Sequence, residues 1–410
     1  MTGQEKQPRV SVVIPTYNRS DMLRRTLTEL TRQSMPADEF EVVVADDGST
    51  DDTKAVVDEF TDRLRVAYTF QEDLGFRAGT ARNAGARMAS GPLLVFLDTG
   101  ALPGPEFLHH HLRAHAAGSR PRMCVGYAYG YNPDEPTEGL REALERWTPA
   151  ETVAHFAGTP AFGDLRDEEL RAVDFDLERR TVPWGLTWTI NVSVTAEDFW
   201  AVGGFDDVFV GWGAEDLELA YRLYRHGLQF HFDRSAWVIE TPHERNWDVM
   251  DKSFLVNMAR FLEKYREPEV EIAWRLVAKI QFDDWEECCT HLAGWTEEVR
   301  DRDVAGEISH AVRDAGSDTR IAVLGCGGSI PDHLPPAVLM DFDRSLLDAA
   351  VAGGRHTGHH AIGLRIPLPD KSVDTVVITS RLAGLRDRWN EDLLAEAHRV
   401  GRRVVAAGSS

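Results

Sequence analysis

Short apolar runs alternate with amphipathic stretches over the first hundred residues, and the runs stop at polar clusters. The apolar runs cover 10–14, 41–45, 65–70 and 93–97. Helical spacing of apolar residues covers 21–33, 52–60 and 78–89. Strands that alternate with helices are joined by right-handed crossovers and form a mostly parallel sheet. The pattern therefore predicts an α/β fold, whose ligands bind at the carboxyl ends of the strands.

Three of these predicted strand ends carry polar side chains. They are Thr16-Tyr17-Asn18-Arg19, Asp46-Asp47 and Asp98. Carboxylates accept hydrogen bonds from base N–H groups and ribose hydroxyls, and arginine forks match phosphate oxygens. The convergence indicates a nucleotide site. Taken alone, the Asp46-Asp47-Gly48-Ser49 stretch also fits an Asx turn.

Composition limits the function classes. The formal net charge is −22, from 45 Lys and Arg against 67 Asp and Glu, which argues against nucleic acid or an anionic membrane surface as partner. No run reaches the roughly 18 apolar residues of a membrane span, and the N-terminus lacks a secretion signal. Four cysteines, two of them adjacent, make no disulfide framework. We expect a cytoplasmic protein with reduced thiols, compatible with a homo-oligomer.

A second strand–helix alternation begins near residue 319. Apolar runs at 320–324, 337–341, 373–379 and 403–407 predict a further small α/β sheet. The stretch before it, 246–315, reads as several helices. We therefore divide the chain into a domain at 1–265, a helical linker region at 266–317 and a C-terminal α/β module at 318–410.

Several motifs resemble one known family. VSVVIPTYNR, VVVADDGSTDDT, LGFRAGTARNAG and VFLD, in this order, are similar to the inverting glycosyltransferases of family 2, which have the GT-A fold. The stretch from Asn191 to Gly227 resembles the acceptor side of the same group. Its Gly-Trp-Gly-x-Glu-Asp core is similar to chondroitin-polymerase-like and β-1,4-galactosyltransferase-like enzymes. The resemblance covers about residues 9–245.

This resemblance implies transfer of a sugar from a nucleoside-diphosphate sugar, UDP being the favoured nucleotide, to an acceptor hydroxyl. Asp216 would be the general base, and Glu215 would hydrogen-bond a sugar. The alternative is that both acids simply stabilise the N-terminus of a helix. The donor residues would be Pro15, Thr16, Tyr17, Arg19, Asp46, Asp47, Arg77, Arg82, Asn83 and Asp98. The acceptor residues would be Trp212, Gly213, Trp184 and Asn191. Arg77 fits a solvated glycine turn nearly as well, and Trp184 and Trp188 fit a buried core equally.

The sequence departs from the family at the metal motif. The usual Asp-x-Asp is here Asp98-Thr99-Gly100, and glycine offers a hard cation only its carbonyl. Asp98 and His243, in ETPHERN, are the candidate ligands for Mg²⁺ or Mn²⁺. The alternative is a metal-independent site in which arginines neutralise the diphosphate. The histidines at 109–111 and 115 fit an ordinary helix better than a metal site.

The C-terminal stretch resembles a truncated class I S-adenosylmethionine methyltransferase. The resemblance rests on the glycine turn Gly325-Cys326-Gly327-Gly328, on IPLPDKSVDTVVI and on Asp341, the candidate ribose-binding acid. Because the module lacks the last strands of that fold, we expect a non-catalytic module without S-adenosylmethionine. The acceptor is expected to be soluble: a small molecule, an oligosaccharide or a peptide. Two other functions stay open, a methyltransferase and a non-catalytic sugar-nucleotide-binding protein.

Overall fold

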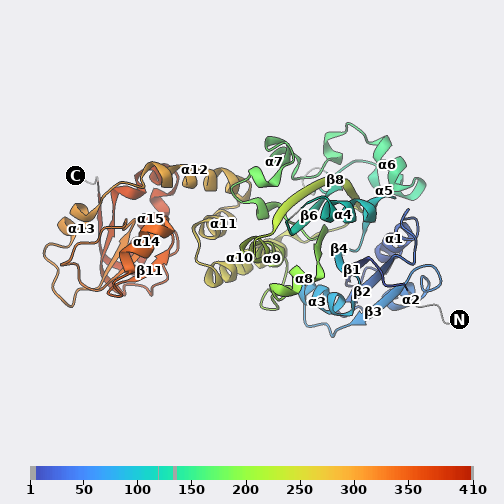
Figure 1. The fold of residues 1–410 in the computed structure, drawn as a ribbon, viewed down its shortest axis with the longest axis horizontal. Coiled ribbons are helices and arrows are strands. Elements are labelled where there is room, and N and C mark those ends of the chain that lie inside the picture. The colour runs from blue at the N-terminus through green and yellow to red at the C-terminus, as the bar shows by residue number, and fades with distance from the viewer. Residues whose placement is uncertain (1–5, 119, 133–135, 408–410) are drawn as a thin grey trace. The chain divides into compact units, whose positions relative to one another are not determined.

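A computed structural model describes residues 6–118, 120–132 and 136–407. The chain divides into two compact units, Met1–Asn257 and Met258–Ser410, and helix α10 (Trp247–Lys264) contains the boundary (Figure 1). The stretch 266–317 therefore counts with the second unit, and its separation as a linker domain stays a prediction. None of the helices in the described ranges is long and apolar enough to cross a lipid bilayer.

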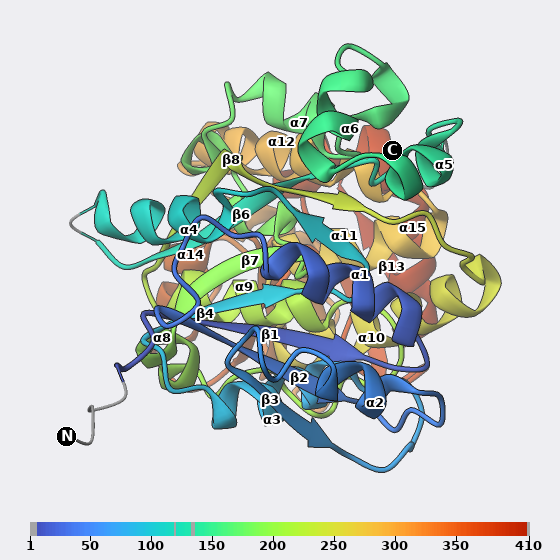
Figure 2. The same ribbon diagram turned by 90° about the vertical axis from the view of Figure 1, so that its right-hand side faces the viewer.

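The first unit is built on an eight-stranded mixed sheet in the order β3-β2-β1-β4-β7-β6-β8-β5 (Figure 2). Its strands are β1 (Val10–Thr16), β2 (Phe40–Asp46), β3 (Val66–Phe70), β4 (Leu93–Leu97), β5 (Ala101–Pro103), β6 (Arg122–Tyr129), β7 (Asn191–Thr195) and β8 (Gln229–Glu240). Its helices are α1 (Ser20–Leu30), α2 (Thr53–Asp58), α3 (Ala78–Met88), α4 (Phe107–Ala116), α5 (Leu140–Arg146), α6 (Pro149–His155), α7 (Asp167–Ala172), α8 (Ala196–Ala201) and α9 (Glu215–Arg225), with 3-10 turns η1 (Pro160–Phe162), η2 (Leu177–Arg179) and η3 (Pro183–Leu186). Strands β3, β2, β1 and β4 run parallel, whereas β7 pairs antiparallel with both β4 and β6. The predicted elements of the first hundred residues are all present, with boundaries shifted by a few residues.

Side chains of the parallel strands point alternately to the two faces of the sheet, and both faces are buried by helices. Val12 and Val42 belong to the core that α1 and α2 cover, whereas Val13 and Val43 face α3. Successive side chains of a strand point to opposite faces, so a continuous apolar run is required here. A Cβ at Gly85 of α3 would lie 2.6 Å from Val13 Cγ1. This close approach of α3 to the sheet positions the side chains at the start of α3 over the strand ends.

The second unit is a fully parallel five-stranded sheet in the order β11-β10-β9-β12-β13. Its strands are β9 (Ile321–Leu324), β10 (Ala337–Asp341), β11 (Thr357–His360), β12 (Val373–Ile378) and β13 (Gly401–Ala406). Its helices are α11 (Pro268–Lys279), α12 (Trp285–Glu298), α13 (Ala305–Ala311), α14 (Arg344–Val351) and α15 (Arg386–Val400), with 3-10 turns η4 (Phe282–Asp284) and η5 (Ser380–Leu385). The short strand β11 was not predicted, because its sequence TGHH has no apolar run.

Candidate active site

Arg82 lies at the centre of the polar groups at the carboxyl end of the first sheet. Its side chain comes from α3 and is 5% exposed. Nη2 is 2.8 Å from Oδ1 of Asp98, just after β4, and Nη1 is 3.3 Å from Oε1 of Glu215, at the start of α9. The guanidinium also lies 5.5 Å from the centre of the Phe205 ring. The fold thus brings together three predicted site residues that are far apart in the sequence.

A glycine-rich loop places Glu215 and Asp216 beside Arg82. Gly211 and Gly213 have φ values of +88° and +89°, which L side chains rarely adopt. The loop ends where α9 begins, so both acids occupy the first turn of that helix. Unpaired N–H groups and the helix dipole stabilise negative charge at this end. The two acids therefore owe their position to the loop geometry and part of their stabilisation to the helix.

Burial raises the pKa of both carboxyl groups. For Asp216 burial is the largest cause, the neighbouring Glu215 charge adds to it, and Arg82 opposes it. For Glu215 burial again comes first, and the positive charge of Arg82 lowers the pKa. A carboxyl group with a raised pKa, when deprotonated, is a better proton acceptor than an ordinary aspartate. Asp216 consequently holds a proton more tightly than an ordinary aspartate does.

Buried polar atoms in this cluster lack hydrogen bonds. Within the described residues, Oε2 of Glu215 and Nε of Arg82 have no hydrogen-bond partner, and neither does Oγ1 of Thr16 at the end of β1. Leaving a buried polar atom unpaired costs about 1–3 kcal/mol. A ligand that supplies the missing partners would remove this cost, so the cluster has the character of a binding site.

The two acids at the end of β2, Asp46 within the strand and Asp47 just after it, are held by hydrogen bonds from neighbouring residues. Oδ1 of Asp46 accepts from the backbone N–H of Ser49 at 2.7 Å, and its Oδ2 accepts from the Tyr68 hydroxyl at 2.7 Å. Asp47 accepts from the backbone N–H of Arg77 at 2.7 Å, and burial raises its pKa. Asp46 thus caps the turn, as the Asx-turn interpretation has it. Asp47 connects the end of β2 to the loop before α3.

The end of β1 and the segment after it form the other side of this edge. Pro15 is half-buried, and the exposed Tyr17 donates a hydrogen bond from its hydroxyl to Asp73 at 2.8 Å. Arg19 is within electrostatic reach of Asp98, and burial lowers its pKa. The positive charge of Arg19 therefore lies near the carboxyl end of β4.

Asn83 is a positioning residue in this structure. Its side-chain amide donates to the Phe205 carbonyl at 2.8 Å and accepts from the Phe205 N–H at 2.9 Å. This pair fixes the loop that leads to Gly211. The guanidinium of Arg77 donates to the backbone carbonyl of Glu72. Both residues shape the site through the loops they hold.

The metal motif is altered in a way that the backbone enforces. Gly100 has φ +94°, and a Cβ there would lie 2.1 Å from Cε of Met22. Its carbonyl accepts two hydrogen bonds from Thr241. His243 is held by the Thr241 carbonyl at 3.1 Å, and burial lowers its pKa to about 4. A neutral imidazole near Asp98 suits a metal ligand, but the described chain contains no cluster of three or more candidate ligands.

Glu240 and Arg245 are site residues that the sequence analysis did not single out. Glu240 ends β8 and forms an ion pair with Arg245. Burial, followed by the charge of Asp98, raises the pKa of Glu240 to about 7. Both residues lie in the ETPHERN motif beside His243, and this position could have identified them from the sequence.

The predicted acceptor residues separate into two groups. Trp212 is half-buried, with its ring centre 5.6 Å from that of Phe254. The neighbouring Gly213 packs so tightly that a Cβ would lie 2.7 Å from the same ring. Trp184, in contrast, is 3% exposed and packs on Tyr221 at 5.2 Å. The loop residues border the Glu215 turn, whereas Trp184 lies in the core, the alternative that its sequence context left open.

Asn191 is fully buried within a polar network. Its Oδ1 is 2.9 Å from Nε2 of His111, and its amide nitrogen donates to the Ala236 carbonyl at 2.8 Å. His111 also contacts Ser193 at 2.8 Å. This network ties α4 to β7, and His115 joins it through the Ser193 hydroxyl at 2.9 Å, so these two histidines of α4 belong to a structural cluster. Trp188, by comparison, is half-buried and packs on Tyr131 at 5.4 Å.

Comparisons with known proteins agree with this geometry. The family described as glycosyl transferase family 2 matches residues 11–160, and the N-terminal domain of galactosyltransferase matches residues 175–244. A validoxylamine A glucosyltransferase of Streptomyces hygroscopicus subsp. jinggangensis is 43% identical, over 97% of this chain and 96% of the relative. The chondroitin synthase of Escherichia coli is 31% identical, over 58% of this chain and 35% of the relative. A mannosyltransferase from Pyrobaculum calidifontis in complex with GDP-Man and Mn²⁺ gives a TM-score of 0.45 at 19% identity, covering 76% of each chain.

Proposed function

Because the chain belongs to the family 2 glycosyltransferases, we propose that it transfers a glucosyl group from a nucleoside-diphosphate sugar to a hydroxyl of a small polar acceptor. The observation that carries the proposal is the cluster in which Arg82 joins Asp98 to Glu215 beside Asp216. The glucosyl group and the acceptor class follow the name of the relative that is 43% identical over nearly the whole chain. UDP is the nucleotide we favour.

The proposed chemistry is a single displacement with inversion. Asp216 takes the proton of the acceptor hydroxyl while that oxygen attacks the anomeric carbon. The bond from the anomeric carbon to the diphosphate oxygen breaks, and the nucleoside diphosphate leaves with the electron pair. The raised pKa of Asp216 supports this role, because the group can hold the proton it receives near neutral pH.

The leaving diphosphate needs positive charge. Arg82 is anchored by Asp98 and Glu215 with its Nε unpaired within the described chain, and Arg19 and Arg245 lie nearby. Arginine forks bind phosphate oxygens in bidentate geometry. These arginines would stabilise the charge that develops on the departing oxygen.

A divalent cation fits this site only together with the donor. Asp98 and the neutral His243 would hold it, and Mg²⁺ or Mn²⁺ sites commonly take their remaining ligands from substrate phosphates and water. When bound, the cation would polarise the diphosphate oxygens and so ease departure of the leaving group. Gly100 contributes no second carboxylate, and its φ of +94°, which L side chains rarely adopt, disfavours any longer side chain there.

On the acceptor side, the loop around Trp212 and Gly213 would contact the acceptor together with Oε2 of Glu215, which has no hydrogen-bond partner within the described residues. That oxygen would accept a hydrogen bond from a sugar or cyclitol hydroxyl. Trp184 and Asn191 are not carried into the acceptor site, because their side chains are buried in the fold. The half-buried Trp188 is the better-placed aromatic side chain in this segment.

The test is the Asp216→Asn variant, assayed with UDP-glucose and validoxylamine A. Removing a general base lowers turnover by about 10²–10⁴-fold, so we expect kcat to fall by that factor while UDP-glucose still binds in calorimetry. The anomeric configuration of the product, read by NMR, tests inversion. Near-normal turnover in Asp216→Asn would refute Asp216 as the base.

A matched control separates the base from its neighbours. Asp198 lies on α8, and its carboxylate bonds the Thr195 hydroxyl at 2.6 Å. Asp198→Asn makes the same chemical change to a capping residue. We expect its turnover per folded molecule to match the parent protein.

A further inference from the structure

The second unit has the strand order of a ligand-binding parallel sheet. In open sheets of this kind the ligand crevice lies outside the carboxyl ends of the strands, at the point where the strand order reverses. Here the reversal falls between β9 and β12. The glycine turn at Gly325–Gly327 follows β9, and Thr379–Arg381 follows β12. Both segments therefore border the position where a nucleotide cofactor would be expected.

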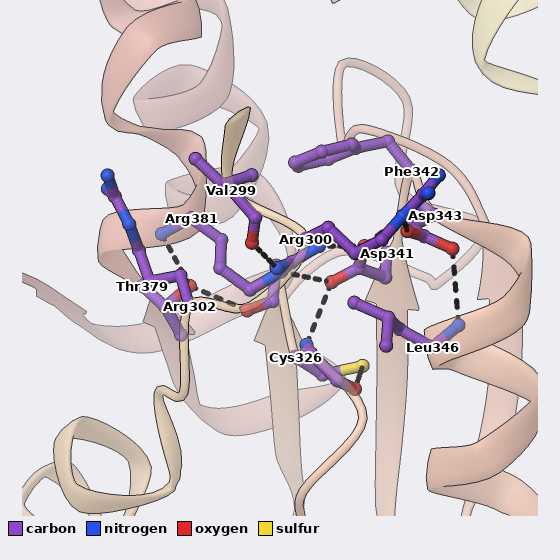
Figure 3. Close-up of polar contacts among 12 residues, drawn as sticks. Val299, Arg300, Arg302, Cys326, Asp341, Phe342, Asp343, Leu346, Thr379 and Arg381 are labelled. Carbon is purple, nitrogen blue, oxygen red and sulfur yellow. Dashed lines mark hydrogen bonds and ion pairs between the residues drawn. The ribbon is translucent and has the colours of Figure 1, made fainter. Parts of the chain in front are cut away.

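Arg381 occupies that position (Figure 3). Its side chain is 0% exposed and packs directly on the glycine turn: a Cβ at Gly325 would lie 3.1 Å from Cβ of Arg381, and one at Gly327 would lie 3.4 Å from its Cδ. Glycines at such a turn allow a ligand to approach the backbone closely. In this chain the space beside them is filled by an arginine side chain.

The acid that would bind a ribose is fully engaged by the same arginine. Nε of Arg381 donates to Oδ2 of Asp341 at 2.9 Å, and Nη2 donates to Oδ1 at 3.0 Å. The backbone N–H groups of Gly327 and Asp343 donate to the two oxygens at 2.8 and 2.9 Å. Asp341 is 0% exposed. A ribose would have to displace the arginine and leave its charge buried, which is costly.

The segment that carries Arg381 also fastens the helices before the sheet. Nη1 of Arg381 donates to the Val299 carbonyl, and the Trp295 indole donates to the Arg381 carbonyl at 2.7 Å. The Ser380 N–H donates to Glu307 of α13 at 2.8 Å, and Arg302 donates to the Ser380 carbonyl at 2.9 Å. Helices α12 and α13 are thus held at the carboxyl end of β12.

The loop after β11, at the same edge, is closed in a similar way. Glu271 of α11 is buried and accepts from the backbone N–H groups of Ile362 and Arg365, each at 2.7 Å, and of Gly363 at 3.1 Å. Burial raises the pKa of Glu271 to about 7, against the effect of these hydrogen bonds. The N–H groups that a ligand could use at this edge are therefore bound by a helix of the same unit.

We propose that the cofactor crevice of this unit has become a joint: the Arg381–Asp341 pair fills it and fastens α12 and α13 to the sheet, so the unit binds neither S-adenosylmethionine nor another nucleotide there. The residues do not fit the cofactor that the glycine turn and Asp341 suggest. The inference is independent of the proposed transfer reaction, because it concerns residues 268–407 alone.

The first test is calorimetric titration of the full-length protein with S-adenosylmethionine and S-adenosylhomocysteine up to about 1 mM, a concentration at which weak sites of roughly 100 μM are well occupied. We expect no saturable heat from either compound. Saturable binding of either compound with one-to-one stoichiometry would overturn the proposal.

The second test measures the joint itself by amide hydrogen exchange. Asp341→Asn leaves the Arg381 charge buried without its counter-ion, so exchange in 285–311 and in β10 should become at least about tenfold faster. The double variant Asp341→Leu with Arg381→Met replaces the pair by apolar groups and should return exchange toward the parent rates. If Asp341→Asn does not fold, the double variant alone decides.

If amide exchange rates in 285–311 are the same in Asp341→Asn as in the parent protein, the proposed joint is refuted. The single variant Arg381→Ala also lacks the ion pair and serves as the reference for fast exchange. A double variant whose amides in 285–311 exchange as fast as those of Arg381→Ala would also overturn the proposal. Far-UV circular dichroism confirms that each variant is folded before exchange is measured.

Discussion

In both units a glycine-rich turn, an acid and an arginine lie near the carboxyl ends of the parallel strands, yet the two arginines have different numbers of hydrogen-bond partners. Arg82 contacts Asp98 and Glu215 with one nitrogen each, and its Nε and Oε2 of Glu215 have no hydrogen-bond partner in the described part of the chain. All three guanidinium nitrogens of Arg381 donate to protein oxygens. Asp98 is 39% exposed and Asp341 is 0% exposed. The comparison teaches that a strand-end acid and arginine indicate a ligand site only where their hydrogen-bonding capacity remains open.

The largest expected difference comes from removing each arginine. Arg82→Met should lower kcat/KM for glucosyl transfer by about 10²-fold or more, because it removes a preorganised cation at the leaving group. Arg381→Met should leave turnover per folded molecule unchanged. It should destabilise the second unit by about 3–5 kcal/mol, because Asp341 stays buried without its partner. Steady-state kinetics and urea unfolding measure the two effects. Equal losses of activity in both variants would break the comparison.

The pH dependence of kcat/KM tests whether Asp216 is the general base of the first unit. In the proposed mechanism Asp216 acts only when deprotonated, and burial together with the Glu215 charge raises its pKa to about 7. Below that pH the deprotonated fraction falls tenfold per unit, so log(kcat/KM) should rise with slope one up to about pH 7 and then level off. An ordinary aspartate would give a plateau from about pH 4 upward. A pH–rate profile that is flat between pH 5 and 8 would contradict the raised pKa.

The smallest expected effect concerns the cation. With Asp98 and His243 as its only protein ligands, Mn²⁺ should bind weakly to the free protein and at least about tenfold more tightly when UDP supplies phosphate oxygens. Electron paramagnetic resonance of free Mn²⁺, with and without UDP, measures this directly. His243→Ala should reduce the gain. Tight Mn²⁺ binding without UDP would show that the ligand set has been assigned incorrectly.

The sequence predicted most of the sheets and helices because apolar periodicity is a local signal. The runs at 10–14, 41–45 and 93–97 are buried on both faces, which requires continuous apolar sequence. Strand β11 was missed because the four residues of TGHH, which pair with β10, contain no apolar run. The motifs also pointed to Arg82, Asp98, Glu215 and Asp216, which the structure brings together. The family prediction was confirmed by the comparisons.

Side-chain partners were not predictable, because they depend on segments far apart in the chain. Asn191 was predicted to line the acceptor site, but it is buried against His111, 80 positions away. Glu240 comes close to Asp98 only because the end of β8 pairs with β5, three residues after Asp98 in the chain. The same applies to Arg381, whose ion pair with Asp341 joins loops 40 residues apart.

Local patterns and motifs were enough to predict the family, the order of strands and helices, and the residue types at each strand end. Which strand end stays open to a ligand follows from the folded arrangement of side chains. That choice depends on whether every nitrogen of a charged side chain has a partner within the fold, as in Arg381, or one nitrogen has none within the described residues, as in Arg82. Whether these partners are available depends on the positions of all neighbouring donors and acceptors, which come together only when the chain folds.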